Sequence, residues 1–156
     1  MKIRIIAIGK TDSGWLKEGL TTYLERVKRY LKIEWQEIEL NSNAKKGKAE
    51  VMILEAGKIL ACIKSSDYVV LLDEKGKQYR SEEFAAWLNK KFISVQEDIV
   101  FVIGGPYGFH DSVKARSSEK LSLSEMTYTH QMIRLFFTEQ LYRAMTILKN
   151  EPYHHS

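Results

Sequence analysis

Three segments of the chain place glycine or polar residues directly after an apolar run, a pattern typical of ligand sites in α/β proteins. They are Leu72-Asp73-Glu74, the run from Ile103 to Gly108 and the run from Leu123 to Tyr128. If the apolar runs are parallel strands, the segments lie together, because ligands of such sheets bind beyond the carboxyl ends of the strands. Glycine there lets the backbone approach a ligand closely. The segments are therefore candidates for a binding site, and a simple tight turn is the alternative for the Gly104-Gly105 pair.

A second set of candidates consists of basic and titratable side chains in the C-terminal half. Histidine suits acid–base chemistry because it changes charge near neutral pH, although each histidine taken alone has a surface or structural role as its alternative. The set is His110, His130, Arg134, Arg143, His154 and His155. The sequence has no Cys/His spacing of the structural zinc type, so we predict no metal.

Common nucleotide-binding and hydrolase motifs are missing. The fingerprint Gly-x-Gly-x-x-Gly opens the first βα unit of dinucleotide-binding domains, whereas Gly-Gly-x-x-Gly follows a late strand here, at 104–108. The absence of a Walker A sequence argues against an NTPase. A Ser–His–Asp arrangement stays open, although no Gly-x-Ser-x-Gly elbow is present. A flavodoxin-like or nucleotide-binding domain is a further alternative, weakened by the missing early phosphate loop.

Composition indicates an ordinary globular domain. The chain has 156 residues, 44% of them hydrophobic and 28% charged, and a formal net charge of +4, which permits a polyanionic partner without requiring one. Cys62 allows no intrachain disulfide, and we interpret it as a small buried helix residue in a reducing compartment. No run reaches the roughly 20 apolar residues of a membrane span, and the N-terminus begins as a strand rather than a signal peptide. We expect a cytoplasmic protein.

Alternating apolar runs and helical periodicities predict an α/β fold with a mostly parallel sheet flanked by helices. The predicted strands are about 3–8, 33–40, 68–72, 99–103 and 121–123. The predicted helices are about 14–31, 49–64, 81–92, a short one from His110, and 130–149. Segment 41–48 is interpreted as a mobile loop and 73–77 as a turn, and Ser81 is predicted to cap its helix, with Glu82 and Glu83 at the positive end of the helix dipole.

The last helix carries two apolar stripes. One contains Ile133, Phe136, Phe137, Leu141, Ala144 and Leu148, and the other contains Met132, Leu135, Tyr142 and Met145. One stripe can cover the sheet, whereas a second needs another surface. A twofold dimer provides that surface most simply, and packing of both stripes within one chain is the alternative.

Four ordered motifs, together with the opening Met1–Lys10, identify a family resemblance. The motifs are Phe101–Gly108, Leu121–Arg134, Glu139–Ala144 and Pro152–His154. They resemble the small SPOUT methyltransferases that modify large-subunit ribosomal RNA, the ribosomal RNA large subunit methyltransferase H family. The similarity runs from end to end of the chain, which makes it specific.

The resemblance implies a deep trefoil knot in a single domain over 1–156, with the cofactor-binding knot at about 68–156. It implies a homodimer, and S-adenosylmethionine bent among three knot loops. The implied contacts are Leu72, Gly104, Gly105, Leu123, Ser124, Glu125, Met126, Thr127 and Tyr128. Main-chain groups of tight loops would bind the adenine edges and the methionine part, while apolar side chains pack on the purine.

The resemblance also implies the reaction. The family methylates N3 of a pseudouridine in the helix 69 loop of 23S ribosomal RNA, and an imide nitrogen is a poor nucleophile while protonated. The family pattern assigns catalysis to His130, Arg134, Arg143, Tyr153 and His154. We expect His154 to deprotonate N3 or orient the base, acting across the dimer, while Arg134 and Arg143 neutralise phosphate or developing charge.

Basic residues outside these motifs are candidates for RNA phosphates, with a solvated surface as their alternative. They are Lys45, Lys46 and Lys48, with Arg26, Lys28 and Arg29 on the first helix. The main alternative function is a catalytically inactive ribosome-binding or assembly factor with the same fold.

A test of the predicted dimer is sedimentation velocity at micromolar concentration. We expect a single species of twice the 18.1 kDa chain mass. A monomer under these conditions contradicts the prediction.

Overall fold

The centre of the fold is a parallel sheet, whose strands at 3–8 and 99–103 are mostly apolar and buried because helices cover both faces. The computed structural model describes residues 1–40 and 46–155, so Lys45 and most of the predicted loop 41–48 lie outside the described residues. The sheet order is β2-β1-β4-β3-β5, with every pair parallel. The strands are β1 (Ile3–Ile8), β2 (Ile33–Ile38), β3 (Tyr68–Gln78), β4 (Ile99–Ile103) and β5 (Glu119–Ser122).

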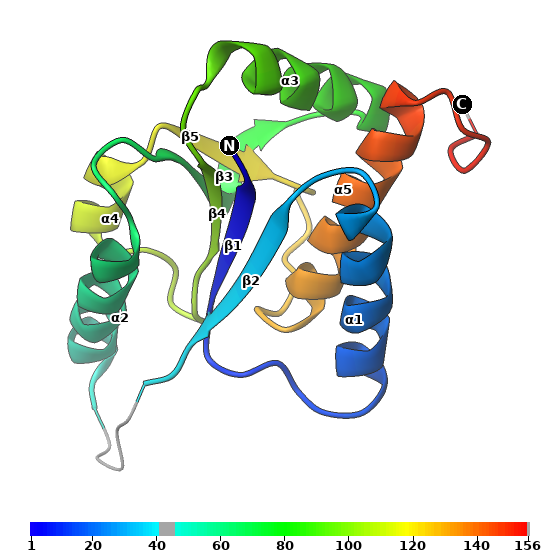
Figure 1. Cartoon of the computed structure of the whole chain (residues 1–156). Helices are drawn as coiled ribbons and strands as arrows, with labels where there is room; N and C mark the ends of the chain where they lie inside the picture. Colours follow the sequence, from blue (N-terminus) through cyan, green and yellow to red (C-terminus); the bar gives the residue numbers. More distant parts are fainter. Residues whose placement is uncertain (41–45, 156) are drawn as a thin grey trace.

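Helices cover both faces of the sheet (Figure 1). On one face lie α1 (Trp15–Lys28), α3 (Ser81–Ser94) and α5 (Met132–Leu148), and on the other α2 (Lys48–Cys62) and α4 (Asp111–Arg116). Each face has its own core: Phe101 packs against Phe137 with ring centroids 4.7 Å apart, while Val102 belongs to the cluster under α2 and α4. The predicted α/β fold with a parallel sheet flanked by helices is confirmed.

The predicted turn at 73–77 is wrong, because β3 continues through it to Gln78. Leu72 and Lys77 both pair with Leu121, so the residues between them bulge out of the ladder. Gly76 permits this, since a Cβ there would lie 2.6 Å from backbone atoms of β5. The bulge carries Asp73, Glu74 and Lys75 to the carboxyl edge of the sheet.

The predicted Ser81 cap is also wrong. Helix α3 is preceded by Arg80, whose backbone N–H donates to the Glu83 carboxylate at 2.9 Å. Ser81 is the first residue of the helix itself, and its hydroxyl donates to Gln140 of α5 at 3.1 Å. Glu82 and Glu83 lie in the first turn, as predicted.

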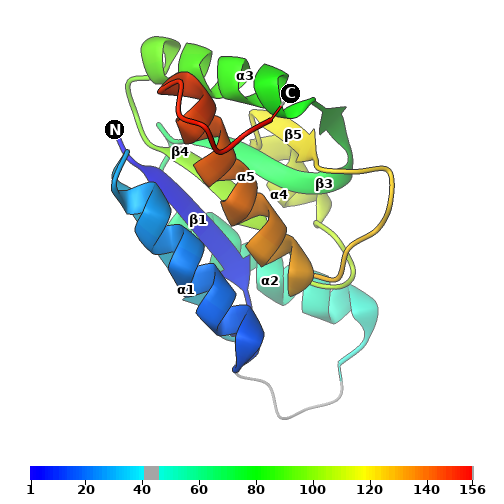
Figure 2. The same cartoon turned by 90° about the vertical axis from the view of Figure 1, so that its right-hand side faces the viewer.

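The second apolar stripe of α5 packs against α1 of the same chain (Figure 2). A Cβ on Gly19 would meet Leu135 at 3.2 Å, and the ring centroids of Tyr23 and Tyr142 are 6.0 Å apart. The sequence argument for a dimer, that this stripe lacks a surface within the chain, therefore fails. The dimer itself stays a prediction, as do the single domain over 1–156 and the trefoil knot, because strand order does not define how the chain is threaded.

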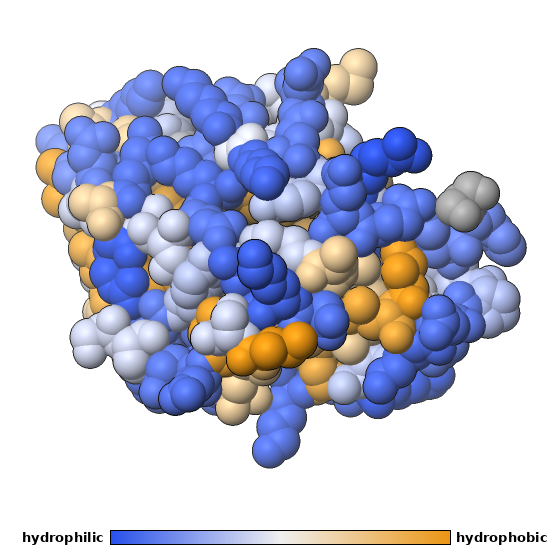
Figure 3. Space-filling view, turned by 90° about the horizontal axis from the view of Figure 1, so that it is seen from above, coloured by the Kyte–Doolittle hydropathy of each residue, from blue (hydrophilic) through white to orange (hydrophobic). Residues whose placement is uncertain are grey.

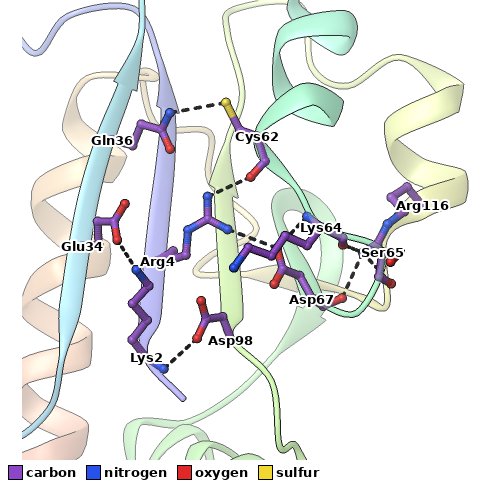
Figure 4. A network of polar contacts seen from close by, with 10 residues as sticks. All are labelled: Lys2, Arg4, Glu34, Gln36, Cys62, Lys64, Ser65, Asp67, Asp98 and Arg116. Carbon is purple, nitrogen blue, oxygen red and sulfur yellow. Dashed lines mark hydrogen bonds and ion pairs between the residues drawn. The ribbon is translucent and has the colours of Figure 1, made fainter.

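At the end of the sheet where β1 begins, the surface is mostly hydrophilic, with apolar side chains in a few small areas (Figure 3). A polar network beneath it joins the strands to the α2–β3 connection (Figure 4). Arg4 donates to Asp67 at 3.1 Å and to the carbonyl oxygen of Cys62 at 2.7 Å. Arg116 of α4 donates to the Lys64 and Asp67 carbonyl oxygens. Asp67 is thus the buried acceptor at the centre of this network.

Removing Asp67 tests this network. The substitution Asp67→Ala leaves the nearly buried Arg4 guanidinium without its carboxylate, and we expect the free energy of unfolding to fall by about 3 kcal/mol in urea titrations. As a control, Glu34→Ala breaks the exposed Lys2–Glu34 pair and should cost less than about 1 kcal/mol. Equal losses for the two variants contradict the assignment.

Candidate functional site

The three strand-end segments meet around one cavity of about 510 Å³. The β3 bulge, the glycine turn after β4 and the segment after β5 form most of its wall. The remaining lining residues come from α2, the α4 region and the start of α5: Lys48, Met52, Phe109, Lys114, His130 and Ile133. The convergence follows from the parallel sheet, because β3, β4 and β5 all end at the same edge.

Eight of the nine predicted cofactor residues line this cavity. They are Leu72, Gly104, Gly105, Leu123, Ser124, Met126, Thr127 and Tyr128. Glu125 does not line it and is exposed to solvent. A local turn accounts for its position: the Ser124 hydroxyl accepts from the Met126 N–H at 2.9 Å, leaving the residue between them at the tip.

A second contact ties this segment to the neighbouring strand. The Thr127 hydroxyl donates to the Glu74 carboxylate at 3.0 Å. The segment after β5 is therefore held against the bulge of β3, and the two form one continuous wall of the cavity.

The glycine turn requires its glycines for three different reasons. A Cβ on Gly104 would lie 3.0 Å from the Phe109 ring, and one on Gly105 would lie 2.3 Å from a Glu55 carboxylate oxygen. Gly108 has φ +80°, a conformation that other residues rarely adopt. Gly105 and Gly108 form a bridge, so Tyr107 stands at the tip with 46% of its surface exposed. The turn thus forms one wall of the cavity with residues 104–108.

Two ionisable groups near the cavity have shifted pKa values. Burial raises the pKa of Glu55, which lies behind the glycine turn. Burial lowers the pKa of His130, and the nearby Arg134 charge lowers it further. At neutral pH His130 is therefore a neutral imidazole, able to accept a proton, at the wall of the cavity.

Arg134 does not reach the cavity surface, because its side chain is fully buried. Its guanidinium donates to the carbonyl oxygens of Ile8 at 2.7 Å, Gly9 at 2.9 Å and His130 at 3.0 Å. These bonds fasten the start of α5 to the end of β1. The predicted contact of Arg134 with phosphate is not compatible with this burial, and its role in the structure is to hold His130 and the α5 terminus in place.

Arg143, Tyr153 and His154 lie together, at the far end of α5. Arg143 is 3.1 Å from His154 Nδ1, and Glu139 accepts from Arg143 at 2.6 Å and from Tyr153 at 2.9 Å. Arg143 lies ten residue steps after Ile133, which places this group about 15 Å along the helix from the cavity. Within one chain, the predicted catalytic residues therefore divide between two places.

Sequence reasoning missed the carboxylates of this group. Glu139 precedes Arg143 by four residues, and this spacing on a helix predicts the ion pair that the two residues form. Glu82, which contacts His154, lies 72 residues earlier and gives no sequence signal. Within residues 1–40 and 46–155, no group of three or more His, Cys, Asp or Glu is placed to hold a metal ion, and no helix has the length and apolarity needed to cross a membrane.

Comparison with known proteins identifies the family. Residues 1–154 match the family described as "Predicted SPOUT methyltransferase". The chain belongs to this family. Relatives named ribosomal RNA large subunit methyltransferase H share 50% identity in Parabacteroides distasonis, 48% in Christiangramia forsetii and 47% in Porphyromonas gingivalis, each covering 99% of both chains. The resemblance inferred from the motifs of this SPOUT chain is confirmed.

The fold also has a counterpart among solved structures. A probable methylase family protein from Haemophilus influenzae superposes with a TM-score of 0.53 at 13% identity, covering 95% of this chain and 66% of the other. At that identity the likeness concerns the fold alone.

Arg134→Met separates a structural role from an RNA contact. We expect it to lower the free energy of unfolding by about 3 kcal/mol or more, because several carbonyl oxygens lose their donor in a buried place. Arg143→Met on the same helix, with a partly exposed side chain, should lower it by about 1 kcal/mol or less. Similar urea midpoints for the two variants contradict the structural role.

Proposed function

We propose that this SPOUT chain transfers a methyl group from S-adenosylmethionine to N3 of a pseudouridine in the helix 69 loop of 23S ribosomal RNA. The observation that carries the proposal is the cavity formed by the bulge, the glycine turn and the segment after β5. Relatives at 47–50% identity over the whole chain are named for large-subunit ribosomal RNA methylation. The finer target follows from the motif resemblance.

The cavity fits such a donor in size and chemistry. Its volume of about 510 Å³ lies within the roughly 300–1,000 Å³ of small-molecule sites. Leu72, Leu121 and Leu123 offer apolar surface for a purine, and Gly104 and Gly105 place main-chain groups at the cavity wall. When bound, the donor supplies a methyl group activated by its sulfonium. The protein has to orient that group and exclude water.

Two kinds of side chain serve the acceptor nitrogen in this proposal. His130 is neutral and lines the cavity, so it is placed to accept the N3 proton. Arg143, held by His154 and Glu139, is placed to stabilise the resulting anion as a fixed cation. This division assigns proton acceptance to the histidine at the cavity.

A twofold dimer accounts for the distance between the two places. If the α5 helices of two protomers pair in opposite directions, the tail of each lies beside the cavity of its partner. Supporting this arrangement, Phe136 of α5 and Met126 near its start are 41% and 77% exposed, and Tyr128 packs on Phe136 at 5.0 Å between ring centroids. Exposed aromatic and Met side chains beside a cavity are typical of interfaces.

Basic side chains near both places are candidates for RNA phosphates. Lys48 lines the cavity, and its Nζ lies 5.9 Å from the centroid of the exposed Tyr107 ring. Arg26 lies over the rings of Tyr23 and Tyr142, and the Tyr142 ring contacts Tyr153 of the tail. Arg29 follows on the same helix end. These positions suit an RNA loop that reaches from α1 of one protomer to the cavity of the other.

The competing function is a ribosome-binding factor without catalysis. It would retain the basic surface and need no donor in the cavity. Binding of S-adenosylmethionine therefore separates the two functions.

The test combines ligand binding with mapping of methyl groups. At 100 times its Kd, S-adenosylmethionine should raise the free energy of unfolding by about 2.7 kcal/mol. Met126→Ala should weaken binding by about 10-fold through lost apolar contact, whereas the equally exposed Ile93→Ala on α3, away from the cavity, should leave it unchanged.

Mass mapping of 23S ribosomal RNA from cells with and without the gene identifies the modified nucleotide. A protein that does not bind the donor favours the non-catalytic factor. A gene-dependent methyl group on another nucleotide overturns the pseudouridine target and leaves methyl transfer standing.

A further inference from the structure

The C-terminal tail makes a set of polar contacts with α3 and α5. We call it the tail cluster, and it consists of Glu82, Glu139, Arg143, Tyr153 and His154. Figure 2 shows the tail folding back across the end of α5 toward the start of α3. His154 lies between Arg143, 3.1 Å from Nδ1, and Glu82, 3.0 Å from Nε2.

These two contacts define which ring nitrogen of His154 carries the proton. A guanidinium can only donate, so Nδ1 must accept from Arg143. A carboxylate can only accept, so Nε2 must donate to Glu82. The hydrogen bond from His154 is the main reason that the pKa of Glu82 lies below its ordinary value, so Glu82 is a carboxylate at neutral pH. The two contacts together match a ring whose proton is on Nε2 and whose Nδ1 accepts.

An imidazolium fits the same geometry poorly. Protonated at Nδ1, it would place one N–H against another N–H of Arg143 at 3.1 Å. Both ring nitrogens are thus engaged, and no lone pair is left to accept a proton from a substrate.

Arg143 is oriented by three neighbours. Besides His154, Glu139 accepts from its other terminal nitrogen at 2.6 Å, and the Tyr153 ring lies 4.8 Å from its guanidinium carbon. Tyr153 is itself fixed by Glu139 and by the Tyr23 hydroxyl at 3.3 Å. Only the bond to His154 depends on a contact with α3. Loss of that contact would leave His154 held by Arg143 alone, while Glu151 and Tyr153 still attach the tail to α1 and α5.

We propose that Glu82 is a positioning residue that holds His154 in one tautomer and, through it, fixes the direction of the Arg143 guanidinium. The inference rests on the proposed function for its catalytic meaning, because Arg143 is the cation assigned there to the acceptor. The motif resemblance predicts proton transfer for His154. In the present proposal His154 instead links Glu82 of α3 to Arg143 of α5 and fixes the orientation of the guanidinium.

The direct test is long-range ¹H–¹⁵N spectroscopy of the full-length protein at pH 7.5, without donor or RNA. The His154 signals are assigned by their loss in His154→Gln. We expect the pattern of a neutral ring protonated at Nε2, retained in Glu82→Gln, whose amide oxygen still accepts. In Glu82→Ala the ring is no longer held against Arg143, so the pattern should become an average of the two tautomers.

The matched control is Glu83→Ala, in the same helical turn. It removes the carboxylate that accepts from Arg80 and does not touch the tail, so the His154 pattern should stay unchanged. A wild-type ring protonated at Nδ1 or at both nitrogens overturns the proposal, as does a pattern that Glu82→Ala leaves unchanged.

The activity test uses large ribosomal subunits that lack the methyl group. Glu82→Ala should lower kcat by about 10- to 100-fold with the Kd for S-adenosylmethionine unchanged, because misorientation affects the reaction rather than donor binding. Glu82→Gln should recover most of the loss, and Glu83→Ala should keep the wild-type kcat.

Equal losses in the two alanine variants overturn the positioning role. A wild-type protein that transfers no methyl group overturns the proposed function instead, whereas the spectrum by itself decides whether Glu82 fixes the tail.

Discussion

The site depends on the buried guanidinium of Arg134. Its bonds to the carbonyl oxygens of Ile8 and Gly9 join the first strand to the last helix across 126 and 125 residues of sequence. The bond to the His130 carbonyl fixes the residue that closes the cavity. A buried arginine is stable only when its N–H donors have acceptors. The carbonyl groups at the carboxyl end of β1 supply two of them. The cavity wall on the α5 side is therefore a product of this contact.

The sheet and its cavity were largely predictable, whereas the contacts between distant side chains were not. Ile3–Ile8 and Ile99–Ile103 are unbroken apolar runs, which a strand buried on both faces requires, and the meeting of strand ends follows from parallel order. The sequence after Leu72 predicts a turn where the structure has a bulge, because charged residues and a glycine are equally typical of both. What decided between them was the pairing with β5, which local sequence does not contain.

The residues assigned to catalysis also show that sequence predicts residue types better than it predicts their contacts. The motifs identified Arg143 and His154, but the role of each depends on Glu82, a residue 72 positions away. Arg134 has the residue type expected for phosphate binding, and only its burial shows that it is committed to backbone carbonyls. Residue type and spacing thus select candidate side chains, while burial and partners limit what each candidate can do.

The glycine turn contains two kinds of position: packed glycines, which tolerate no side chain, and the exposed Tyr107, which is free to vary. Its shape is set by the Gly105–Gly108 bridge and by close packing against Glu55 and Phe109. The Tyr107 side chain at the tip contributes little to that packing and faces solvent. The residue at position 107 can therefore change in size or charge with little effect on folding. A substitution there would alter the outer rim of the pocket and leave the packed glycines beneath it unchanged.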